Sequence, residues 1–107
     1  MKKGMIKVSV LYPNTDGSKF NMDYYQTKHV ELVTGLLGEA LKGASIESGL
    51  GGGEAGSKAP FVAIANMYFD TIENFEQSFG PNSSKIMGDL PNFTDIEPVV
   101  QISKVII

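Results

Sequence analysis

The segment from Phe61 to Phe69 reads FVAIANMYF and is apolar on both sides of a β-strand, except at Asn66. Successive side chains of a strand point to opposite faces, so a strand of this kind has to be covered on both faces. Helices of the same chain can cover one face. A second copy of the chain is the simplest cover for the other face, and residues 99–107 repeat the two-sided pattern. The sequence therefore predicts a sheet that lies between helices and a partner subunit.

The rest of the chain predicts two more strands, two main helices and a short third helix. Residues 5–12 alternate, with an apolar side made by Ile6, Val8, Val10 and Tyr12. The other predicted elements are a loosely alternating edge strand at 40–50, a hairpin loop at 49–58, helices at 21–37 and 70–79, and a short helix at 82–90. The glycines of the hairpin loop match GxGxxG, but a strand follows where a nucleotide site needs a helix.

The predicted order is strand, helix, strand, strand, helix, strand. This is the order of a ferredoxin-like β-α-β-β-α-β sandwich, an α+β fold with a four-stranded antiparallel sheet and helices on one face. A length of 107 residues suits a single domain, residues 1–107. We expect the open face of the sheet, rich in Val, Ile and Leu, to meet its copy across a two-fold axis. The expected assembly is a homodimer that forms a dimeric α+β barrel.

The first predicted helix carries the only histidine of the chain, His29. Asn21 can cap its start, and Gly38 can end it in a left-handed conformation. Tyr25 and His29 are four residues apart, so they lie on the same face as the apolar residues that follow at helical spacing. The residues predicted on this inward face are Tyr25, His29, Leu32, Val33 and Leu36.

Composition excludes several classes of function. A net charge of −3 provides no basic surface for nucleic acid, and no apolar run is long enough to span a membrane. The chain has no cysteine, which rules out a disulfide framework, a thiolate nucleophile and a zinc–thiolate site. With one histidine, a transition-metal site is not predicted, and no flavin, nicotinamide or haem motif predicts a cofactor. A cytoplasmic location is the default expectation.

His29 has two interpretations. In the first, it is a packing histidine that is hydrogen-bonded by Tyr25, Asn66 or a backbone carbonyl. In the second, it is a general acid or base in an apolar cavity between helix and sheet, because imidazole transfers protons readily at neutral pH. Tyr25 shares the face of His29 and is the predicted residue that orients it or a substrate. The predicted catalytic residues are therefore His29 and Tyr25.

Other polar and aromatic residues are predicted to contact an apolar small-molecule ligand. Asn66 interrupts an apolar strand, so its amide needs a partner, which a ligand can supply. Asp89 lies in a segment that can cover one end of the sheet. The predicted substrate-binding residues are Tyr12, Asn66, Tyr68, Asp89 and Phe93.

Several motifs resemble those of the EthD family of small dimeric α+β barrel proteins, named for ethyl tert-butyl ether degradation. These motifs are Tyr12-Pro13-Asn14, FNMDYY followed by His29 and Leu32-Val33, PFVAIANMYFD, and IMGDLPNFTDIEPVVQIS. The resemblance covers nearly the whole chain. It departs from the family at Glu31, where the family usually has a proline, and a carboxylate there either alters the environment of His29 or faces solvent.

The resemblance implies a role in the oxidative degradation of ethers or related apolar compounds, with an oxidoreductase label and a monooxygenase system as protein partner. The residues themselves predict proton transfer by His29. Two alternatives stay open. Related dimeric α+β barrels cyclise, dehydrate or isomerise ring compounds without a cofactor, and a non-catalytic dimer can bind an apolar metabolite or act as a scaffold.

Overall fold

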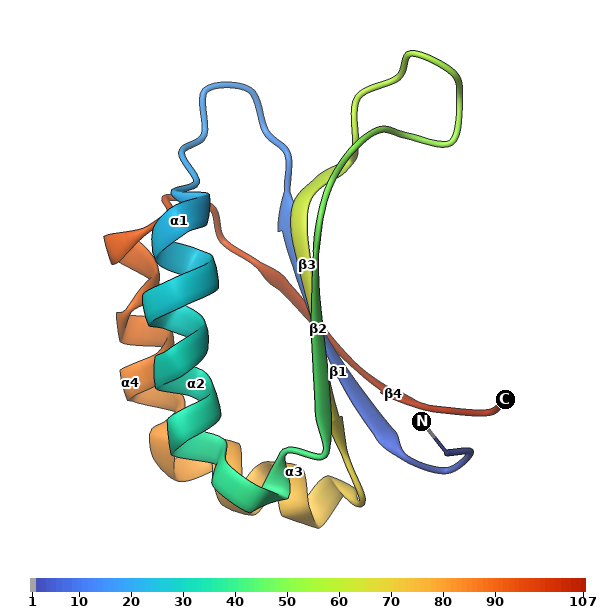
Figure 1. Cartoon of the computed structure of the whole chain (residues 1–107), viewed down its shortest axis with the longest axis vertical. Coiled ribbons are helices and arrows are strands. Elements are labelled where there is room, and N and C mark those ends of the chain that lie inside the picture. Colours follow the sequence, from blue (N-terminus) through green and yellow to red (C-terminus); the bar gives the residue numbers. More distant parts are fainter. Residues whose placement is uncertain (1) are drawn as a thin grey trace.

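The computed structural model describes residues 2–107 of the chain. It contains four strands and a layer of helices (Figure 1). The strands are β1 (Ile6–Pro13), β2 (Gly43–Ser48), β3 (Phe61–Phe69) and β4 (Val99–Lys104). The helices are α1 (Met22–Tyr24), α2 (Val30–Leu37), α3 (Ile72–Phe79) and α4 (Ser83–Gly88), and a π-helical turn (Tyr25–His29) joins α1 to α2. Short 3₁₀ turns span Gly38–Ala40, Gly80–Asn82 and Leu90–Asn92.

The strands form one antiparallel sheet in the order β2-β3-β1-β4. All the helices pack on the same face of this sheet, which Figure 1 shows nearly edge-on. The predicted ferredoxin-like α+β arrangement is thereby confirmed, as is the edge position of β2. The strand predicted at 99–107 is shorter than expected, because regular pairing with β1 ends at Lys104.

The first helical region begins and ends as the sequence predicts. The side chain of Asn21 accepts a hydrogen bond from the backbone N–H of Tyr24, and Gly38 ends α2 with a φ of 58°. That positive φ suits glycine, which has no Cβ to clash there. The π-helical turn in the middle of the region was not predicted. In it the N–H of Val30 bonds to the carbonyl of Tyr25, five residues earlier.

The core between sheet and helices is divided into two clusters. One contains Val8, Phe69 and Phe75, and the other contains Tyr12, Tyr25 and other residues near the opposite end of β1. Val10 packs against both clusters. Because the helix layer does not fill the space between them, the sheet and helices leave room for a cavity at this point.

The open face of the sheet is more polar than predicted. Strand register places Leu11, Val62, Ile64 and Val99 on this face. It also places the polar side chain of Asn66 at the centre of the face. The side-chain amide of Asn66 donates to Glu47 Oε1 at 2.8 Å and to Ser45 Oγ at 3.3 Å, and Ser9 Oγ donates to its oxygen at 3.4 Å. The face expected to be rich in Val, Ile and Leu therefore carries such residues but is also polar, because alternation on β1 and β2 brings serine and glutamate to this side. Among residues 2–107, none of the helices combines the length and apolar character needed to cross a membrane.

Candidate functional site

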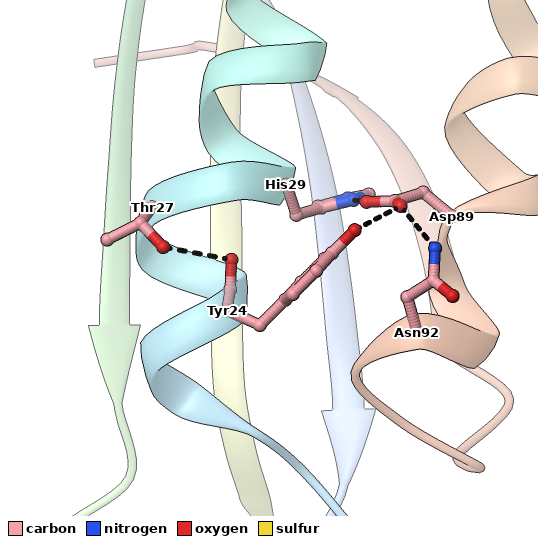
Figure 2. Close-up of polar contacts among 5 residues, drawn as sticks. All are labelled: Tyr24, Thr27, His29, Asp89 and Asn92. Carbon is pink, nitrogen blue, oxygen red and sulfur yellow. Dashed lines mark hydrogen bonds and ion pairs between the residues drawn. The ribbon is translucent and has the colours of Figure 1, made fainter.

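His29 forms a close pair with Asp89. Its Nδ1 lies 2.9 Å from Asp89 Oδ2, and 7% of the His29 side chain and 11% of the Asp89 side chain are exposed. Figure 2 shows the imidazole reaching from its helix toward the carboxylate, which comes from the segment after α4. The partner of His29 is therefore Asp89, and not Tyr25, Asn66 or a backbone carbonyl as the sequence suggested.

The segment that carries Asp89 is fastened to the start of the first helix. The backbone N–H of Asn21 donates to the carbonyl of Phe93 at 2.7 Å, and Thr94 Oγ1 donates to the carbonyl of Lys19 at 2.6 Å. Residues Phe20 and Thr94 also form an isolated β-bridge. These contacts bring Asp89 beside His29 although 60 residues separate them along the chain.

Two further donors hold the Asp89 carboxylate. The hydroxyl of Tyr24 donates to Oδ1 at 2.7 Å, and the amide of Asn92 donates to the same oxygen at 2.9 Å (Figure 2). Asn92 can do so because the turn Leu90–Asn92 folds back on Asp89. Burial raises the pKa of Asp89, but the hydrogen bonds from Asn92, His29 and Tyr24 outweigh it and leave that pKa below its ordinary value. The carboxylate is thus ionised at neutral pH.

An ionised carboxylate only accepts hydrogen bonds, so Nδ1 of His29 has to be the donor in the pair. In the neutral imidazole the other nitrogen, Nε2, is then an acceptor. Nε2 has no hydrogen-bond partner among residues 2–107, and no side-chain nitrogen or oxygen in that range is both fully buried and unpartnered. Nε2 therefore reaches accessible space, and a histidine held in this way can take a proton from a ligand and return it.

A cavity of about 350 Å³ lies between the sheet and the helices, and His29 lines it. Its walls come from all four strands on one side and from the π-helical turn, α2, α3 and α4 on the other. Apolar side chains such as Val8, Val33 and Phe75 dominate the lining, and no Lys, Arg, Asp or Glu in the described part of the chain contributes to it. The volume lies at the lower end of the range of roughly 300 to 1,000 Å³ found for small-molecule sites.

Aromatic rings fix the plane of the imidazole. The ring of Tyr25 stacks on His29 with centres 5.7 Å apart, and the ring of Phe93 lies 4.6 Å away. Tyr12 also lines the cavity, and its ring packs edge-on against that of Tyr25. Burial raises the pKa of Tyr12 to about 12 and also raises the pKa of Tyr25, which the nearby Tyr12 raises further. Both phenols stay protonated at neutral pH, so they are hydrogen-bond donors and not bases.

The structure brings together five of the seven predicted site residues. Tyr12, Tyr25 and His29 line the cavity, Asp89 binds His29, and Phe93 packs against it. The other two do not join them. Strand register directs the side chains of Asn66 and Tyr68 to the open face of the sheet, so although Asn66 borders the cavity, its amide bonds to Ser45 and Glu47 on the far side.

Sequence reasoning missed Tyr24 and Asn92 as members of the site. The signal for Tyr24 was its phenolic hydroxyl, which needs a hydrogen-bond partner, and that partner is Asp89. The signal for Asn92 was its position three residues after Asp89, the spacing of a local turn. Glu31, at the position where the resemblance implies proline, is exposed to solvent. Within residues 2–107, His, Asp and Glu side chains do not gather in groups of three or more that would suit a metal ion.

Comparison with known proteins identifies relatives of the whole chain. A family model described as the EthD domain matches residues 13–97. The solved structure of an EthD-like protein from Ralstonia eutropha is 40% identical, has a TM-score of 0.92, and aligns over 99% of this chain and 96% of its own. No match was found among curated proteins.

Two more distant structures share the fold. An ethyl tert-butyl ether (EthD) family protein from Bacillus halodurans is 18% identical, with a TM-score of 0.65 over 94% of this chain and 97% of its own. A dimeric ferredoxin-like protein of unknown function from Thermobifida fusca is 14% identical, with a TM-score of 0.61 over 98% of this chain and 94% of its own.

Proposed function

The chain belongs to the EthD domain family, and from this premise we propose that it is a catabolic protein in which His29 transfers a proton to or from an apolar small molecule. The observation that supports the proposal is the pair of His29 and Asp89 at the wall of the cavity. Asp89 holds Nδ1, and Nε2 is left free for a ligand. A packing histidine would have both nitrogens satisfied by the protein.

The cavity supports a neutral, largely apolar ligand. Among residues 2–107, no Lys or Arg lines the cavity to balance a carboxylate or phosphate, and the Asp89 carboxylate behind His29 would repel an anion. The protonated hydroxyls of Tyr12 and Tyr25 suit an oxygen atom of the ligand. In this proposal Tyr25 orients the substrate and His29 acts as the acid or base.

Proton transfer by His29 fits more than one kind of catabolic reaction. Isomerisation or dehydration of a ring compound needs only the acid and base that His29 supplies. In the oxidative degradation of ethers or related compounds, the chain would act beside a monooxygenase system and perform the proton transfer. We propose the homodimer as its assembly, supported by the open sheet face and by the dimeric description of the Thermobifida fusca protein.

Native mass spectrometry of the purified protein tests this function. The proposal predicts a dimer that carries an added mass corresponding to a neutral apolar compound. In the variant His29→Gln the added mass should persist, because the cavity is intact, while conversion of that compound should fall by roughly 10²-fold or more. A His29→Gln protein that converts the compound at the wild-type rate would rule out the assigned role of His29.

A further inference from the structure

We propose that Tyr24 is a positioning residue for the pair of His29 and Asp89, and that the π-helical turn Tyr25–His29 is what allows it to be one. The inference rests on the proposed function of His29 as an acid or base. Tyr24 does not line the cavity and is not assigned any contact with a ligand. Its hydroxyl acts on His29 only through the carboxylate that both residues bind.

The geometry of the helix decides which side chains can share one carboxylate. In an α-helix, Tyr24 and His29, five residues apart, would point in directions roughly 140° apart around the axis. A single carboxylate could not then bind both side chains. The π-helical turn has hydrogen bonds between residues five apart, so it brings such residues close together on one side. As a result, Tyr24 and His29 both reach Asp89 (Figure 2). Tyr25 still stacks on His29.

The two oxygens of the Asp89 carboxylate bind different donors. Oδ1 accepts from the Tyr24 hydroxyl and the Asn92 amide, and Oδ2 accepts from His29 Nδ1. Two donors on Oδ1 hold the carboxylate in one rotamer with Oδ2 directed at the imidazole. They also favour the ionised form of Asp89, which can only accept, so the proton of the pair stays on Nδ1 and Nε2 stays free.

The hydrogen bond of the Tyr24 hydroxyl can be removed without loss of the packing of the Tyr24 ring. The ring of Tyr24 stacks on Phe93 with centres 6.1 Å apart, a contact that phenylalanine would keep. Tyr24→Phe therefore removes the hydrogen bond to Asp89 and leaves the packing in place. Tyr68→Phe is the matched control, because Tyr68 is a tyrosine on the opposite face of the sheet from the site.

The test is NMR of the ligand-free protein, with ¹⁵N detection of the imidazole and ¹³C detection of the Asp89 carboxyl. The imidazole signals are unambiguous because the chain has one histidine. We expect the wild-type protein and Tyr68→Phe to show the Nδ1–H tautomer alone at pH values where the imidazole is neutral. In Tyr24→Phe we expect the pKa of Asp89 to rise and a second tautomer, protonated on Nε2, to appear.

Unchanged tautomer and unchanged Asp89 pKa in Tyr24→Phe would overturn the inference. If that variant does not fold, the wild-type spectrum decides alone, since a mixture of tautomers or a dominant Nε2–H form contradicts it. None of these readouts needs a substrate. If they come out as expected while no ligand is ever converted, the positioning by Tyr24 stands and the proposed function fails.

Discussion

Asp89 links the protonation of the site to the stability of the protein. Its pKa in the folded state is lowered, despite burial, by hydrogen bonds from Asn92, His29 and Tyr24. A group with a lowered folded pKa contributes stability above its unfolded pKa, and this contribution is lost as the pH falls through the folded pKa. We therefore predict that part of the free energy of unfolding is lost from about pH 3.8, the ordinary aspartate value, downward.

Urea unfolding at stepwise lower pH, from 6 to about 3, measures this loss. Asp89→Asn cannot ionise, so its free energy of unfolding should fall less steeply than that of the wild type in the acid range. Asp70→Asn, at an exposed aspartate, is the control and should follow the wild type. Parallel acid curves for the wild type and Asp89→Asn would contradict the account of the carboxylate.

The sequence was informative about the positions of His29 and Tyr25 but not about the hydrogen-bond partner of His29. Helical spacing alone places these two residues on one inward face. The contact with Asp89 depends on tertiary packing across 60 residues, which no local pattern encodes. For Asn66, the sequence indicated only that the side-chain amide needs a hydrogen-bond partner. An isolated polar residue in an apolar strand does not reveal on which face of the sheet that partner lies.

The helix that carries His29 is positioned by its first turn. Asn21 caps it through the N–H of Tyr24 and also bonds to Phe93 through its own N–H. Asn21→Ala removes the side-chain acceptor and should lower the free energy of unfolding by about 1 kcal/mol, measured by urea titration. Asn21→Asp keeps an acceptor and should retain the stability of the wild type. Equal stability of the two variants would show that the cap contributes nothing.

The π-helical turn is the part of this helical region that could not be predicted from the sequence. Both ends of the helical region could be predicted, because Asn21 and Gly38 carry strong capping preferences. The turn could not, because periodicity arguments assume 3.6 residues per turn throughout. Helical interruptions of this kind are frequent at functional sites, and here the interruption coincides with Tyr25 and His29.

For the whole molecule, the order of strands and helices along the chain followed from the sequence, while the polar character of the open face did not. We predict that this face forms the dimer interface. Ile64→Glu would bury a charge at the centre of that face and should raise the dimer dissociation constant by roughly 100-fold or more. Sedimentation equilibrium measures the change.

Ile72→Glu is the matched control, because Ile72 is an isoleucine on α3, 44% exposed, in the helix layer. It should leave the protein dimeric. A wild-type protein that is monomeric at micromolar concentration, or an Ile64→Glu protein as dimeric as the wild type, would contradict the assignment of this face.

We propose that His29 presents a free Nε2 to the apolar cavity and transfers protons there. A generic probe can test it without knowledge of the natural substrate. 5-Nitrobenzisoxazole is a small, neutral ring compound, and a base that removes its ring C–H proton breaks the N–O bond to give a coloured nitrile-bearing nitrophenolate. Ala65→Leu should slow this reaction by filling the cavity, whereas Ala55→Leu, in the exposed loop between β2 and β3, should not.

The most direct measurement is the rate of this ring opening by the wild-type protein and by His29→Gln, side by side at neutral pH. We predict that the wild type is faster by roughly 10²-fold or more, in line with the usual contribution of a general base. Equal rates for the two proteins would show that His29 does not act as a base in the cavity, and the central claim would be wrong.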